Sequence, residues 1–145
     1  MNILLVEDDY FLGRSTAYLL EKAGKHRVRL THKAADVFKY AQSGLVELVV
    51  MDVNLPGTFW QGKEVTGIEL SRLLKQQMKQ QPKIDRFPIV LLTSNTKGVH
   101  HSRLLIDALA DGIYPKPIAD ANDFLALLEA VSAQRDIHGP TVSAS

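Results

Sequence analysis

The sequence predicts a single α/β domain built as a doubly wound sandwich, with five parallel strands in one sheet and helices on both of its faces. Short apolar runs alternate five times with longer segments of helical periodicity. The runs are rich in valine, isoleucine and leucine, as is typical of strands buried on both faces of a parallel sheet. The length of 145 residues fits one such domain, whose strands are joined by right-handed helical crossovers.

The five expected strands are short, and the last is the weakest. In chain order they are Ile3–Val6, Val28–Thr31, Leu48–Met51, Ile89–Leu92 and Gly112–Tyr114. The segments between and after them carry apolar residues at helical spacing. The expected helices are marked by Leu12, Thr16, Leu19 and Leu20; by Ala34, Phe38 and Ala41; by Leu70, Leu73 and Leu74; by Leu104, Leu105, Ala108 and Leu109; and by Phe124, Leu127, Leu128 and Val131.

Two segments fit neither pattern. Pro56–Thr66 is rich in glycine and has no regular period, which predicts a long loop after the third strand. After Val131 the composition becomes small and polar, which is typical of a frayed end. We therefore expect a domain at residues 1–134 and a flexible tail or linker stub at residues 135–145.

Composition and charge exclude several classes of function. The chain has no cysteine, which rules out disulfide scaffolds, thiolate zinc sites and cysteine nucleophiles. Its formal net charge is +1, so no strong overall charge indicates direct binding to nucleic acid or a membrane. The first residues turn acidic too early for a signal peptide, and no apolar stretch approaches the roughly 20 residues of a membrane span. We therefore expect a cytoplasmic protein.

Side chains suited to binding phosphate and a divalent cation follow four of the expected strands. Glu7 and Asp8 follow the first strand, Asp52 the third, Thr93 the fourth and Lys116 the fifth. Ligands of parallel sheets bind beyond the carboxyl ends of the strands, so these groups are expected to converge. Carboxylates in one cleft repel one another unless a cation lies between them, and oxygen ligands suit Mg²⁺. The pattern predicts a Mg²⁺-assisted phosphoryl site.

Each of these residues has a plainer explanation when it is taken singly. Asp9 is expected to cap a helix, and Asp52 alone could cap a loop at a strand end. Lys116 alone would be an ordinary surface charge. Only their joint placement at the ends of four of the five expected strands favours a phosphoryl site.

The ordered motifs resemble the receiver domains of two-component response regulators, which have a flavodoxin-like fold. The resemblance covers roughly residues 2–131. It is carried by Leu4-Leu5-Val6-Glu7-Asp8-Asp9, Val49-Val50-Met51-Asp52-Val53-Asn54-Leu55-Pro56, Gly67-Ile68-Glu69-Leu70, Leu91-Leu92-Thr93-Ser94 and Lys116-Pro117-Ile118.

The resemblance implies a role for each matching residue. Asp52 would be the phosphoacceptor. Asp8 would bind Mg²⁺ directly, Glu7 would bind it through water, and the backbone carbonyl of Asn54 would be a further ligand together with Asp52. Thr93 would be the switch hydroxyl.

Lys116 would contact a phosphoryl oxygen and, before phosphorylation, Asp52. The phosphoryl donor would be a histidine kinase or a phosphotransfer protein. The output protein or a second subunit would meet the face formed by the fourth helix, the fifth strand and the fifth helix. Such a domain stores a phosphoryl group and is not a multiple-turnover enzyme.

The chain departs from the family pattern at two places that bear on function. Gly67 follows the acceptor by fifteen residues, farther than the corresponding glycine of the family, so the segment Pro56–Thr66 contains an insertion that includes Phe59 and Trp60. Ile113 occupies the usual position of the switch aromatic, and Tyr114 follows it. A shift of one residue on a strand turns a side chain to the other face, which leaves the switch mechanism open.

Three alternative functions compete with a phosphorylated receiver. An aspartyl-nucleophile phosphatase would need a proton-transferring carboxylate where this chain has Asn54. A flavin carrier would bind phosphate at the first loop, where the acidic residues Glu7 and Asp8 would repel it. A receiver-like interaction module that is never phosphorylated remains open.

Overall fold

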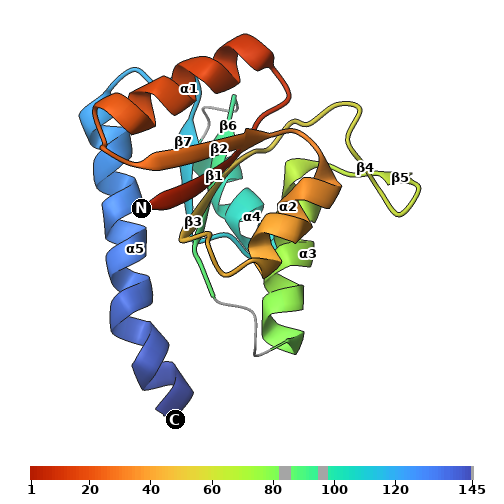
Figure 1. The fold of residues 1–145 in the computed structure, drawn as a ribbon, viewed down its shortest axis with the longest axis vertical. Coiled ribbons are helices and arrows are strands. Elements are labelled where there is room, and N and C mark those ends of the chain that lie inside the picture. The colour runs from red at the N-terminus through yellow and green to blue at the C-terminus, as the bar shows by residue number, and fades with distance from the viewer. Residues whose placement is uncertain (82–85, 95–97, 145) are drawn as a thin grey trace.

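The computed structural model of the protein describes the backbone at residues 1–81, 86–94 and 98–144, and side chains over the same ranges except 98–99 and 135–144. Its centre is a five-stranded parallel sheet in the order β2-β1-β3-β6-β7 (Figure 1). The strands are β1 (Asn2–Val6), β2 (Arg27–Thr31), β3 (Leu48–Asp52), β6 (Ile89–Thr93) and β7 (Gly112–Pro115). The predicted doubly wound fold is confirmed, since the strand order reverses between β1 and β3.

Five helices connect and follow the strands. They are α1 (Tyr10–Lys22), α2 (Ala34–Gln42), α3 (Gly67–Gln80), α4 (Gly98–Ala108) and α5 (Ala121–Ala144). The helical backbone of α5 therefore runs on past Val131. The expected division into a domain and a flexible tail at residues 134 and 135 stays a prediction, because the side chains of that segment lie outside the described residues. Within the described ranges, no helix is both long and apolar enough to span a membrane.

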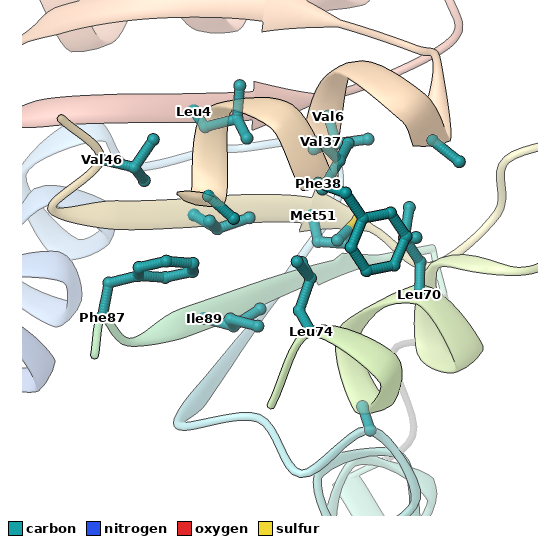
Figure 2. Close-up of a cluster of buried hydrophobic side chains, with 14 of the residues drawn as sticks. Leu4, Val6, Val37, Phe38, Val46, Met51, Leu70, Leu74, Phe87 and Ile89 are labelled. Atoms are coloured by element: carbon teal, nitrogen blue, oxygen red, sulfur yellow. The ribbon is translucent and has the colours of Figure 1, made fainter. Parts of the chain in front are cut away.

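Each face of the sheet is covered by its own apolar cluster. Along β1, Leu4 and Val6 belong to one cluster and Ile3 and Leu5 to the other, as the alternation of side chains on a strand requires. Helices α2, α3 and α4 contribute to the first cluster, which Figure 2 shows, and α1 and α5 contribute to the second. Both faces bury apolar side chains, so the carboxyl edge of the sheet is left for polar groups.

The segment Pro56–Thr66 contains a small hairpin, which corrects the expectation of an irregular loop. Strands β4 (Phe59–Trp60) and β5 (Lys63–Glu64) pair antiparallel across Gln61 and Gly62. Both turn residues have positive φ, 53° at Gln61 and 77° at Gly62, as in a type I′ turn. The available signal in the sequence was Gly62 at the second turn position, with the aromatic pair Phe59-Trp60 before the turn and the charged pair Lys63-Glu64 after it.

The two aromatic residues of the hairpin have different environments. The Trp60 ring stacks on Phe38 of α2, with a distance of 4.2 Å between ring centroids and an interplanar angle of 29°. Phe59, its neighbour, points the other way and is 57% exposed. Trp60 therefore packs the hairpin onto the domain, whereas Phe59 does not.

Candidate functional site

Asp52 lies at the carboxyl end of β3 and is held by polar contacts on both oxygens. Its side chain is buried, with 2% of the residue exposed. The backbone N–H of Asn54 donates to Oδ1 at 3.0 Å, and Lys116 Nζ donates to Oδ2 at 2.7 Å. The contact with the ammonium group gives this buried carboxylate a defined orientation.

Glu7 and Asp8 extend this site from the end of β1. One ligand oxygen from each of Glu7, Asp8 and Asp52 can lie within 4.8 Å of the others. Because β1 and β3 are adjacent and parallel, their last residues lie side by side at the same edge of the sheet. The sequence-predicted convergence of the three carboxylates is therefore present in the structure.

Glu7 is the most electrostatically perturbed group of the site. Its pKa is raised from an ordinary value of 4.5 to about 8. Burial is the largest cause, a hydrogen bond with Asp52 and the negative charges of Asp52 and Asp8 act in the same direction, and the positive charge of Lys116 lowers the pKa. Its Oε2 atom is buried and has no hydrogen-bond partner. In the absence of a cation, Glu7 is thus mostly protonated at neutral pH.

The donor set fits a small, hard cation. Three carboxylates close enough to share one ion, of which one has a buried oxygen without a partner, are a costly arrangement that a divalent cation relieves. Asp9, which follows them in the chain, takes no part, since its Oδ1 accepts from the N–H of Leu12 and caps α1 as predicted.

Thr93 and Lys116 approach the site from the neighbouring strands. Asp52 pairs with Leu92 in the register of β3 and β6, so Thr93 lies one residue beyond that pair and is 3% exposed. The backbone N–H of Lys116 donates to the Thr93 carbonyl at 2.7 Å. This hydrogen bond links the ends of β6 and β7 next to the site. The peptide bond from Lys116 to Pro117 is cis.

Gly67 contacts the acceptor in a way that the sequence did not reveal. Its N–H donates to the Val53 carbonyl at 2.9 Å. A Cβ atom built on Gly67 would lie 1.8 Å from the carbonyl oxygen of Asp52, so no other residue fits without a backbone shift. In the sequence, Gly67 was marked by the family motif Gly67-Ile68-Glu69-Leu70, but the motif did not show which backbone it would touch.

The model of the response regulator receiver domain matches residues 3–129 of the chain. The chain belongs to the receiver-domain family. Receiver domains are modules of two-component signalling, and domains of this family generally signal rather than turn over substrate.

Two curated proteins illustrate how this receiver domain relates to others. The chain is 34% identical to the swarming motility regulation protein RssB of Serratia marcescens over 128 residues, which cover 87% of the chain and 46% of RssB. It is 29% identical to the CAI-1 autoinducer sensor kinase/phosphatase CqsS of Vibrio cholerae over 105 residues, 68% of the chain and 14% of CqsS. The chain thus spans less than half the length of these curated relatives.

A solved receiver structure of similar size superposes on nearly the whole chain. The BeF3-activated N-terminal receiver domain of RstA from Klebsiella pneumoniae is 26% identical and gives a TM-score of 0.72. The match covers 91% of this chain and 98% of the RstA chain. The fold predicted from the sequence is therefore that of a receiver domain.

Ile113 and Tyr114, which are adjacent on β7, pack on opposite faces of the sheet. Ile113 packs against the cluster that includes α4, and Tyr114 packs against the cluster that includes α5, as the one-residue offset predicts. The Tyr114 hydroxyl donates to Asp123 Oδ2 at 3.1 Å, and its ring lies 5.0 Å from that of Phe124. Tyr114 is therefore attached to the first turn of α5.

Proposed function

We propose that Asp52 accepts a phosphoryl group from a histidine kinase or phosphotransfer protein and that the domain acts as a phosphorylation-controlled switch. The buried pair between Lys116 Nζ and Asp52 Oδ2, 2.7 Å apart beside two further carboxylates, is the observation that carries the proposal. A purely structural ion pair would not need Glu7 and Asp8 next to it, since both add repulsion.

The proposed transfer needs only positioning and charge neutralisation. An Asp52 oxygen attacks the phosphorus of a phosphohistidine, the P–O bond forms as the P–N bond breaks, and the electron pair returns to the imidazole nitrogen. Lys116, already bonded to Asp52, would neutralise a phosphoryl oxygen. Glu7, Asp8, Asp52 and the Asn54 carbonyl would hold Mg²⁺, which supplies positive charge beside the incoming oxygens when bound.

The phosphoryl group would then act as a signal through its neighbours. It adds about −1.5 to −2 charges and strong acceptors to a buried edge of the sheet, where the hydroxyl of the buried Thr93 would respond. A change at Thr93 would bias the face formed by α4, β7 and α5 toward a second conformation that meets the output partner. With Ile113 at the usual aromatic position, that coupling would run through a route other than the family's.

Treatment with acetyl phosphate and Mg²⁺ tests the proposal. The wild-type protein is expected to gain the mass of one phosphoryl group, and the Asp52→Asn variant is expected to gain none. Amide NMR shifts induced by a beryllium fluoride mimic should centre on residues around Asp52 and Thr93. Unchanged mass and unchanged spectra would favour the unphosphorylated interaction module.

The phosphatase alternative predicts a different kinetic result. Asn54 contributes a backbone N–H to Asp52 and has no side-chain group that transfers protons usefully. We therefore expect the phosphorylated protein to lose its phosphoryl group slowly, and sustained hydrolysis of a phosphate monoester by catalytic amounts of protein would contradict the proposal.

A further inference from the structure

A groove lies between the inserted hairpin and α3, away from the acidic site. It encloses about 440 Å³ and is lined by Trp60, Gln61, Lys63, Val65, Glu69, Arg72, Leu73 and Gln76. The hairpin is found beside α2 and α3, at the opposite side of the view from α5 (Figure 1). The groove thus exists only because of the insertion and lies apart from the α5 side of the domain.

The lining of the groove carries two positive charges and one negative charge. Lys63 and Arg72 are both exposed, and among the residues that the structure describes neither makes an ion pair. Glu69 is the one acidic lining residue, and its carboxylate accepts from the Thr66 hydroxyl at 3.4 Å at the start of α3. Two cations are therefore available to an acidic ligand.

The floor of the groove is apolar, and the Trp60 ring on its hairpin side is held by a stack on Phe38. Trp60 is half-buried, and the stack on Phe38 fixes its ring and leaves only part of its surface accessible. Leu73 is also half-buried, and Val65 is buried. An aromatic ring held in place beside a leucine is the kind of surface on which an apolar side chain anchors at low entropic cost.

We propose that this groove binds an acidic peptide segment of a partner protein, one with an apolar side chain between carboxylates. The carboxylates would meet Lys63 and Arg72, and the apolar side chain would contact Trp60 and Leu73. Phe38 already covers one face of the Trp60 ring, so a stacked base of a nucleic acid fits less well than an apolar side chain. The proposal does not depend on phosphorylation of Asp52.

Selection of peptides from a random library tests the proposal. The wild-type chain is the bait, and a Lys63→Glu/Arg72→Glu variant is the counter-bait. An Arg14→Glu/Lys22→Glu variant on α1 carries the same change in net charge at exposed positions far along the chain from the groove, and it controls for long-range electrostatics. We expect the peptides that bind the wild type and this control, but not the groove variant, to be acidic and to contain an apolar residue.

The affinity of a selected peptide can be read from the protein itself. Trp60 is the only tryptophan of the chain, so its fluorescence reports occupation of the groove when the peptide lacks tryptophan. We expect the groove variant to bind about tenfold more weakly and the control variant less than about twofold more weakly, with a loss of affinity in high salt.

Several results would overturn the proposal. They are equal binding to the groove and control variants, selected peptides without an acidic preference, and an oligothymidine that changes Trp60 fluorescence at lower concentrations than the peptide does. A concentration-dependent change in Trp60 fluorescence without any ligand would assign the groove to a second copy of the chain and would also contradict the proposal.

Discussion

The acidic site and the inserted hairpin both follow β3, yet the domain holds them in different ways. Asp52 is buried, bonded through both oxygens and in contact with the backbone of α3 at Gly67. The hairpin contacts the domain mainly through the stack of Trp60 on Phe38, and most of its residues are exposed. The difference teaches that the surrounding core fixes the acceptor, whereas the insertion is a surface element added to it.

The insertion is tolerated because it closes on itself. The Val65 N–H donates to the Thr58 carbonyl at 2.9 Å, so the two ends of the insertion meet where the chain leaves and rejoins the domain. Leu55 and Val65 are both buried at this point. The chain therefore re-enters α3 at Gly67 with the contact to Asp52 intact, although the intervening loop is long.

The largest expected effect is that of Gly67→Ala. The new Cβ would overlap the Asp52 carbonyl, so α3 must shift, and we expect a loss of about 4 kcal/mol in the free energy of unfolding together with slower phosphorylation. Urea unfolding measures the first effect and acetyl phosphate kinetics the second. Gly62→Ala is the matched control in the hairpin, where the positive φ costs about 1 kcal/mol and no atom lies within 4 Å. Equal losses in the two variants would remove the distinction between the regions.

The second-largest expected difference between the acidic site and the hairpin is in the pH dependence of stability. Because the folded state raises the pKa of Glu7 from 4.5 to about 8, the metal-free protein should lose stability as the pH rises between these values. Glu7→Gln should abolish this loss. Glu64→Gln, an exposed position of the hairpin, should leave the profile unchanged. Urea unfolding with a chelator at several pH values provides the measurement.

The affinity for Mg²⁺ should also depend on the titration of Glu7, but it should rise with pH where the stability falls. A proton on Glu7 competes with the cation, so binding should strengthen as the pH rises toward about 8. Calorimetric titration at pH 6 and pH 8 measures this difference, and it should vanish in Glu7→Gln. An equal affinity at the two pH values in the wild type would argue against Glu7 as a ligand-site residue.

Within the hairpin, the two aromatic residues should differ. Trp60→Ala removes the stack on Phe38, and we expect a loss of about 1.5 kcal/mol. Phe59→Ala removes an exposed ring and should cost less than about 0.5 kcal/mol. Thermal unfolding of both variants makes the comparison, and similar losses would show that Phe59 also packs onto the domain. Kinase-dependent phosphorylation of the double variant tests whether the pair influences access to Asp52.

The smallest expected effect is at the hairpin turn. Gln61 adopts a positive φ of 53°, which asparagine accepts more readily at the first position of a type I′ turn. Gln61→Asn should stabilise the hairpin by about 0.5 kcal/mol, and a β-branched residue in Gln61→Val should destabilise it. Hydrogen exchange at the Val65 amide reports this local change, since that amide donates within the insertion.

Much of the fold and the convergence of the site followed from local patterns in the sequence. Buried parallel strands require continuous apolar runs, so β1 and β3 were recognisable, and the polar residues directly after them had to meet at one edge. The hairpin was missed because strands of two residues carry no detectable period. Its turn depended on positive φ at Gln61, a residue with no special preference for that conformation.

The sequence by itself therefore determined the strands of the sheet and the set of groups at its carboxyl edge, because buried strands and the alternation of their side chains follow from hydrophobic patterning. Only the tertiary structure decided that a buried Glu7 oxygen lacks a partner and that Gly67 touches the acceptor backbone. These contacts join residues distant in the chain, and their geometry depends on how helices and loops pack. The same holds for the groove, whose walls come from an insertion and a helix.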